Sequence, residues 1–243
     1  MARYEKGAGS TVFNVSLKDS APIKRFPFLL KTGVKVKDCP QDGLATGNEL
    51  DTLYAISDKM KSIVVAAIAN REAGTFSYQC ERTDYYYVGD TSNIRKRLET
   101  AFKTYYPEYK YSIEIRNDPD WDAYLKFLYP SEDVMEYMSN QKVIFGLTKA
   151  GDDLSKPRQV DHWLYFKSEG DRSLFITYAL KENFKLEGQK KLDKGTRPFQ
   201  LRISRTDNVD MSSIMEITQK LRKKAKELNG DYDGWETFVI KGK

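Results

Sequence analysis

The organisation of the chain is clearest in Asn229-Gly-Asp-Tyr-Asp-Gly-Trp-Glu-Thr-Phe-Val-Ile240, which joins a long helical pattern to a final strand. Its Asn229-Gly230 pair is typical of a helix that ends in the left-handed conformation. Asp233-Gly234 is a second turn signal. From Trp235 onward, alternate residues are expected to point to opposite faces of a strand. The chain therefore ends in a helix, a tight turn and a strand.

The same order of elements can be followed through both halves of the chain. Phe76-Ser-Tyr-Gln-Cys-Glu-Arg-Thr-Asp84 in the first half parallels Phe199-Gln-Leu-Arg-Ile-Ser-Arg-Thr-Asp207 in the second. Each half shows the order β-α-β-β-α-β, which is that of the ferredoxin-like fold. We therefore predict an α+β protein of two tandem ferredoxin-like units, whose antiparallel sheets carry helices on one face. The break at Tyr129-Pro130-Ser131 places the domains at residues 1–132 and 133–243.

The spacing of apolar residues predicts the individual elements. In the first half we expect strands at Val12–Leu17, Phe26–Val36, Phe76–Cys80 and Tyr111–Ile115, helices at Glu49–Met60 and after Asp90, a β-branched run at Ser62–Ala69, a hairpin turn at Asn70–Gly74, and a short helix from Asp118-Pro119-Asp120-Trp121. In the second half we expect the end of a lead-in helix at Val143–Ala150, a strand at Val160–Phe166, a helix capped by Asp171, a hairpin of Leu186–Leu192 with Phe199–Thr206, and a last helix with a Ser213–Glu216 capping box.

Composition and charge limit the classes of function. The 243 residues carry a net charge of +5 and 31 % of them are charged, without a basic arm in either half. This distribution argues against DNA binding. The N-terminus has no signal-peptide pattern, and no apolar run is long enough to cross a bilayer. Cys39 and Cys80 show neither metal-site spacing nor a disulfide framework. We expect a soluble cytoplasmic protein in a reducing setting, without a DNA or membrane partner.

Catalytic signatures are sparse. The single histidine, His162, lies on a strand of alternating pattern, where a packed imidazole is the usual interpretation. The glycine spacing matches neither a P-loop nor a dinucleotide fingerprint. The segment from Asn229 resembles the first half of a calcium loop, but Ile240 stands where the bidentate glutamate is required. We predict no catalytic, cofactor-binding or metal-binding residue, and an enzyme of unrecognised type is the third choice of function.

A surface for single-stranded RNA is the alternative function. Aromatic side chains beside cations can stack bases on a sheet face. The candidate RNA-binding residues are Tyr85, Tyr86, Tyr87, Arg95, Arg97, Lys220, Arg222, Lys223 and Lys224. Against this alternative, the consensus of RNA-recognition modules is missing from Phe199–Asp207, and a lysine-rich helix face is usually solvated.

Several segments resemble two known families. Residues 133–243 resemble the regulator of ribonuclease E activity B family. The resemblance is carried by Asp231-Tyr-Asp-Gly-Trp-Glu236, Ala150-Gly-Asp-Asp153 and Asp161-His-Trp163. The first half is similar to the family called domain of unknown function 695, through Gly43-Leu44, the Glu49–Met60 helix, Asp118-Pro-Asp-Trp121, Tyr124-Leu125 and Phe127-Leu-Tyr-Pro130. The two families are known to occur in tandem.

The resemblance implies a non-catalytic protein that acts by binding another protein. Members of the regulator family bind the ribonuclease and so alter RNA decay. We therefore expect a protein-interaction module with a protein partner, and RNA as the alternative ligand. The candidate partner-binding residues are Asp231, Tyr232, Asp233, Trp235, Glu236, Asp161, His162 and Trp163. Among them, Trp235 is also expected to be a core anchor, because a large aromatic at a strand start usually packs inside.

Overall fold

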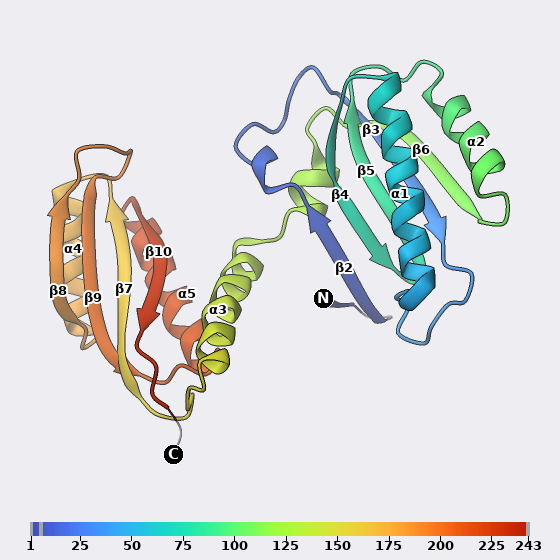
Figure 1. Ribbon diagram of the computed structural model, residues 1–243. Helices are drawn as coiled ribbons and strands as arrows, with labels where there is room; N and C mark the ends of the chain where they lie inside the picture. The colour runs from blue at the N-terminus through green and yellow to red at the C-terminus, as the bar shows by residue number, and fades with distance from the viewer. Residues whose placement is uncertain (1, 5–6, 242–243) are drawn as a thin grey trace. The chain divides into compact units, whose positions relative to one another are not determined.

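The computed structural model describes residues 2–4 and 7–241 (Figure 1). The contacts divide the chain into two compact units, unit 1 from Met1 to Pro130 and unit 2 from Ser131 to Lys243. Both units are α+β with an antiparallel sheet, which confirms the predicted fold class. Within the described residues, no helix is both long and apolar enough to span a membrane. That the units are separate domains, divided between residues 132 and 133, stays a prediction.

Unit 1 is built on a six-stranded sheet with the strand order β1-β2-β4-β5-β3-β6. Its elements are β1 (Ala2–Tyr4), β2 (Gly7–Phe13), a 3-10 turn (Val15–Leu17), β3 (Phe28–Lys35), α1 (Gly47–Ala67), β4 (Asn70–Tyr78), β5 (Glu81–Val88), α2 (Ile94–Tyr105), β6 (Tyr111–Asn117) and a π-helix (Ala123–Leu128). Strands β4, β5, β3 and β6 make the ferredoxin-like part of the sheet. Strands β2 and β1 extend that part at its β4 edge.

Unit 1 has a hydrophobic core on each face of its sheet. On one face, helix α1 packs through residues spaced three and four apart: Leu53, Ile56, Met60 and Val64. On the other face, the Trp121 ring stacks on Tyr87 with ring centroids 3.9 Å apart. The Tyr87 hydroxyl donates to Asp118 at 2.6 Å, and Asp118 also accepts the backbone N–H of Ala123. Asp118 therefore accepts backbone N–H groups at the start of the π-helix, in the segment where the sequence predicted a short helix.

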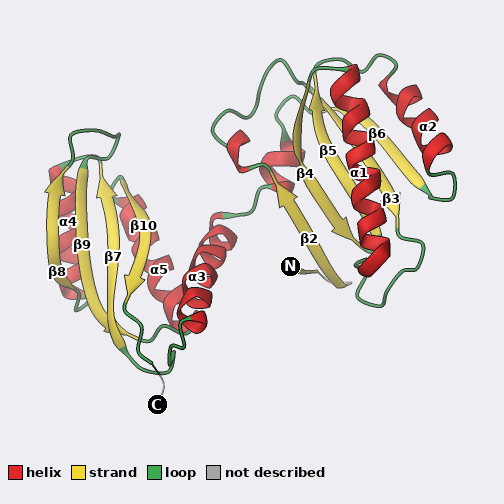
Figure 2. Ribbon diagram, viewed as in Figure 1, coloured by secondary structure: helices red, strands yellow, loops and turns green. Residues whose placement is uncertain are grey.

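Unit 2 has a four-stranded sheet with the ferredoxin-like order β10-β7-β9-β8. Its elements are α3 (Glu132–Lys149), β7 (Arg158–Phe166), α4 (Glu169–Lys181), β8 (Lys185–Lys191), β9 (Phe199–Asp207), α5 (Met211–Glu227) and β10 (Gly230–Thr237). Helices α4 and α5 pack on one face of this sheet, and α3 packs against α5 (Figure 2). Alternate residues of β7 are buried against the helices. The residues between them lie on the opposite side, which we call the open face.

Some predicted elements of unit 1 are wrong. The Ser62–Ala69 run mostly belongs to α1, and Asn70–Gly74 begins β4 instead of forming a hairpin turn. The β-branched side chains are accommodated because Val64 packs in the buried row of the helix, and tertiary packing outweighs weak intrinsic propensity. The expected Val12–Leu17 strand is divided between β2 and the 3-10 turn.

The helix starts in the chain also differ from the predictions. The N-caps are Asn93, Ser168 and Asp210, in place of Asp90, Asp171 and Ser213. The Asp210 carboxylate accepts two backbone N–H groups, which leaves no capping role for Ser213. At the end of α5, Asn229 takes the predicted left-handed conformation with a φ of 52°.

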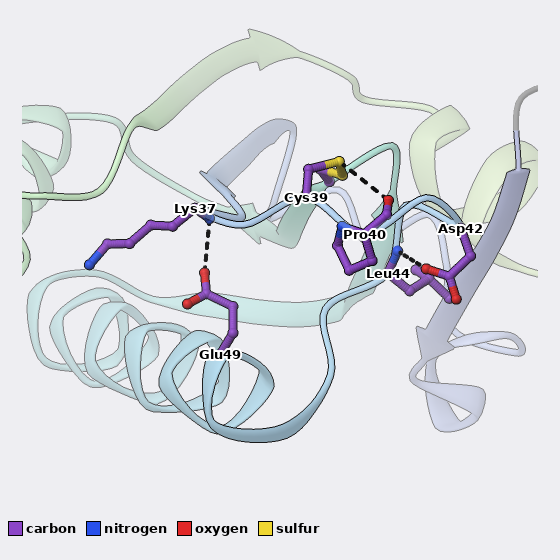
Figure 3. The surroundings of a disulfide bond; sticks show 7 residues. Lys37, Cys39, Pro40, Asp42, Leu44 and Glu49 are labelled. Atoms are coloured by element: carbon purple, nitrogen blue, oxygen red, sulfur yellow. Dashed lines mark hydrogen bonds between the residues drawn. A yellow bond between two sulfur atoms is a disulfide. The ribbon is translucent and has the colours of Figure 1, made fainter.

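The two cysteines are joined by a disulfide, contrary to the prediction (Figure 3). Cys39 follows β3, and Cys80 lies in the turn between β4 and β5. Because β3 pairs with β5, residues 41 positions apart come together, with a Cα–Cα distance of 5.5 Å. Disulfides persist mainly in oxidising compartments, so the bond does not support the expected reducing setting. Cytoplasmic localisation stays a prediction.

Candidate interaction surface of unit 2

Strands β10 and β7 bring most of the candidate partner-binding residues together, but on two different faces. The cross-strand pairs are Trp235–His162, Glu236–Asp161, Gly234–Trp163 and Asp231–Tyr165. Because neighbouring residues of a strand point to opposite faces, the first pair faces the helices and the other three face the open side. The Asp233-Gly234 turn signal is a β-bulge within β10, where Asp233 is the extra residue.

Trp235 is buried and connects three elements. Its side chain packs with Leu147, Val160 and Ile214, and it is 7 % exposed. The indole N–H donates to the Asn140 side-chain oxygen at 2.8 Å, and the Asn140 amide donates to the Thr218 hydroxyl at 3.0 Å. Trp235 therefore joins β10 to α3 and α5. This confirms the predicted core anchor and removes Trp235 from the accessible partner-binding residues.

His162 and Tyr232 are also turned toward the helices. The Nδ1 atom of His162 lies 2.9 Å from the Tyr232 hydroxyl, and the imidazole is fully buried. Burial, with a smaller contribution from the Arg205 charge, lowers the pKa of His162 to about 3. Burial also raises the pKa of the Tyr232 phenol. Both groups are therefore neutral at physiological pH, and the imidazole cannot reach a partner or substrate.

Unit 2 is expected to lose stability in mild acid because of His162. The folded pKa lies below the unfolded value of about 6.5, so the unfolded chain takes up a proton that the folded imidazole does not. Stability is therefore fully present above pH 6.5 and falls as the pH drops from there toward 3. Between pH 7.5 and 5.5 the loss from this residue should be about 1.4 kcal/mol. Urea unfolding at both pH values should show this loss in the wild type and not in His162→Gln. An equal loss in both proteins would contradict it.

The open face carries a row of polar and aromatic side chains around Trp163. The Arg202 guanidinium lies 5.4 Å from the centre of the Trp163 ring, and its Nε atom lies 3.0 Å from an Asp161 carboxylate oxygen. Next along the face, the Gln200 amide donates to the Tyr165 hydroxyl at 3.0 Å. These contacts connect β7 to β9 and fix the orientation of Trp163, which is half-buried.

Arg202, Tyr165 and the role of Gly234 were not predicted from the sequence. The alternation of β9 was visible, so a position for Arg202 on one face could have been inferred. That Arg202 lies beside Trp163 could not be inferred, because this pairing depends on the register of β7 with β9.

The Ala150-Gly-Asp-Asp153 segment has a structural role. The side chains of Asp152 and Arg158 form an ion pair and both are fully buried. The Arg158 guanidinium also donates to the backbone oxygens of Asp153, at 2.6 Å, and Phe238, at 3.2 Å. Asp152 in turn accepts the Ile240 N–H at 2.7 Å. The pair therefore attaches the segment after β10 to the loop before β7.

The candidate RNA-binding residues are divided between unit 1 and unit 2. Tyr85, Tyr86 and Tyr87 lie in β5 and are at most 7 % exposed, because the aromatic run fills both cores of unit 1. They cannot stack bases, which corrects that prediction. Arg95 contacts Glu99, and Arg97 is exposed on α2.

The cations of α5 belong to unit 2 and are mostly held by carboxylates. Arg222 pairs with Glu136 of α3 at 2.7 Å and also contacts Glu132 and Asp133. Lys220 pairs with Glu216 and Lys224 with Glu227, whereas Lys223 is exposed. Arg222 therefore attaches α5 to α3, whereas Lys220 and Lys224 are paired within α5.

Two known families match the chain, one within unit 1 and the other within unit 2. Residues 1–129, more than half of the chain, match a family of unknown function (DUF695). The chain belongs to this family. Residues 138–237, from within α3 to the end of β10, match the family Regulator of ribonuclease activity B. Both matches agree with the resemblances seen in the sequence. None of the curated proteins matches the chain.

Two solved structures align with most of this DUF695 chain at low similarity. One is a proposed glycine cleavage system transcriptional repressor, with 12 % sequence identity and a TM-score of 0.27. The other is an unknown protein from Galdieria sulphuraria, with 14 % identity and a TM-score of 0.25. Each alignment covers 87 % of this chain and 98 % of the other. At these TM-scores, the two structures carry no argument about this chain.

Proposed function

We propose that this DUF695 protein is a non-catalytic interaction module that regulates RNA decay by binding a ribonuclease. The observation that carries the proposal is the match of residues 138–237 to Regulator of ribonuclease activity B. The matched span includes every strand of the unit 2 sheet and most of its helical layer. A regulator that acts by binding needs an accessible surface, and the open face around Trp163 is such a surface.

The chemistry of unit 2 favours binding over turnover. The chain has one histidine, and its ring is enclosed between the sheet and the helices with a pKa of about 3. The Asp152–Arg158 pair is also fully buried, and its side chains are hydrogen-bonded to backbone groups of the segment after β10 and of the loop before β7. On the open face, the Asp161 carboxylate is oriented by Arg202 and by the Gln159 amide, as in a recognition surface.

Capture from the native host tests the protein partner. The tagged full chain should retain a ribonuclease, identified by mass spectrometry, both before and after nuclease treatment of the lysate. Retention after nuclease is expected because protein–protein contacts do not need an RNA bridge. Loss of every partner after nuclease would contradict the proposal and indicate that RNA bridges them.

Direct RNA binding is tested by salt dependence. Labelled single-stranded RNA should bind weakly to the wild type and to Lys220→Glu/Lys223→Glu, which changes two exposed positions of α5. Tight binding that falls with a log–log slope of about −0.7 per phosphate, and that the variant loses, would show an RNA-binding protein instead.

A further inference from the structure

We propose that a slot above Gly234 on the open face of unit 2 receives an arginine or lysine side chain from a basic segment of the protein partner. The slot is formed by Gly234, Trp163, Asp231 and Glu236. The inference rests on the proposed function and adds to it the contact surface and the chemistry of the partner.

The glycine creates free space in the middle of the face. A Cβ placed on Gly234 would meet no atom within 4 Å, so the Trp163 side chain opposite does not cover it. Its φ of 149° is one that side-chain-bearing residues rarely adopt, which keeps a glycine at the bulge. The space above Gly234 is therefore open to a group from outside.

Trp163 provides an aromatic wall for a cation. Arg202 reaches the ring from β9, on one side of β7, and Asp161 holds it there. The slot lies on the other side, toward β10, where Gly234 contributes no side chain. A guanidinium or ammonium group that enters there can contact the indole as a second cation. Such contacts favour tryptophan over other aromatic residues.

The charges around the slot complement a basic group. Asp231 and Glu236 flank Gly234 along β10 and are exposed, as is the bulged Asp233. None of these three carboxylates takes part in an ion pair within residues 2–4 and 7–241. By register, Lys185 and Lys190 of the same face lie on β8, two strands beyond β7. A basic peptide is therefore attracted to the β10–β7 side, where a phosphate backbone would be repelled.

Binding of a fluorescein-labelled arginine-rich peptide to the full chain tests the slot. The peptide contains no aromatic residues. Wild type should bind this peptide more tightly than a glutamine-substituted peptide of equal length, and added salt should weaken the binding. Trp163→Ala and, separately, Asp231→Asn/Glu236→Gln should each weaken it about tenfold. The control Glu182→Gln/Asp193→Asn removes two exposed carboxylates elsewhere in unit 2 and should change the affinity less than about twofold. Circular dichroism confirms that each variant is folded.

Tryptophan emission gives a second readout of the same contact. Trp121 and Trp235 are buried, so a quencher in solution reaches Trp163 first. The peptide should protect the wild-type emission from quenching, and this protection should be absent in Trp163→Phe. Equal affinity of the wild type and both slot variants, or equal losses in the control, would overturn the proposal. Tighter binding of single-stranded RNA than of the peptide, lost in Trp163→Ala, would also overturn it.

Capture of the ribonuclease separates this inference from the proposed function. If the slot variants retain the ribonuclease as well as the wild type does, the slot is refuted and the function stands. If the wild type captures no ribonuclease, the proposed function fails, and the peptide titration alone then decides whether the slot binds basic segments.

Discussion

Replacing Arg158 with alanine is expected to lower the free energy of unfolding of unit 2 by about 3–5 kcal/mol. The change leaves the Asp152 carboxylate buried without its partner, and it removes the donors for the backbone oxygens of Asp153 and Phe238. An uncompensated buried charge is more costly than the loss of the attraction itself. Urea unfolding of the full chain, with amide exchange of β7 and β10 assigning the transition to unit 2, measures the effect.

A double variant controls for this interpretation. Arg158→Met/Asp152→Leu removes both charges and keeps apolar volume, so it should lose less stability than Arg158→Ala alone. A loss below about 1 kcal/mol in Arg158→Ala would mean that the pair is solvated in solution. A double variant much less stable than the single one would show that the pair contributes mainly through its hydrogen bonds to the backbone.

Trp235→Ala is expected to lower the free energy of unfolding of unit 2 by about 3–5 kcal/mol. The substitution removes the packing of the ring against Leu147, Val160 and Ile214. It also leaves the buried Asn140 side-chain oxygen without its hydrogen-bond donor. Because the ring joins β10 to α3 and α5, the loss should appear as faster exchange of amides in all three elements. The same urea experiment measures both quantities.

Trp235→Phe separates the two contributions. Phenylalanine keeps most of the apolar contact and cannot donate to Asn140, so it should cost about 1–3 kcal/mol. Its loss should therefore be smaller than that of alanine. A loss below about 1 kcal/mol in Trp235→Ala would instead indicate an exposed ring and would return Trp235 to the candidate partner-binding residues.

The sequence predicted the fold of unit 2 well because its strands have one buried face. In β7, Val160, Leu164 and Phe166 alternate with half-buried residues, and this period of two is the signal that a strand leaves in a sequence. Strand β5 leaves no such signal, because Tyr85, Tyr86 and Tyr87 fill cores on both faces of its sheet. The same tyrosines were therefore misjudged as an exposed binding surface.

The candidate site was only partly predictable, for a reason of geometry. The Asp231-Tyr-Asp-Gly-Trp-Glu236 segment indicated that β10 belongs to the candidate site, but this segment contains both core and surface residues. The bulge at Asp233 and the register with β7 decide which of them reach solvent, and neither follows from local sequence. The Cys39–Cys80 bond and the Asp152–Arg158 pair depend in the same way on contacts made by folding.

Regulation of a ribonuclease by this protein can be measured as a change in the cleavage rate of the captured ribonuclease. A labelled single-stranded RNA is incubated with this ribonuclease and increasing amounts of the full-length protein, of the Trp163→Ala variant, or of the Glu182→Gln/Asp193→Asn control. The proposed function predicts that wild type and control change the rate in proportion to the fraction of ribonuclease bound. The slot predicts in addition that Trp163→Ala needs a higher concentration for the same change. A rate that stays constant when the ribonuclease is saturated with the wild-type protein would contradict the claim that this protein regulates a ribonuclease.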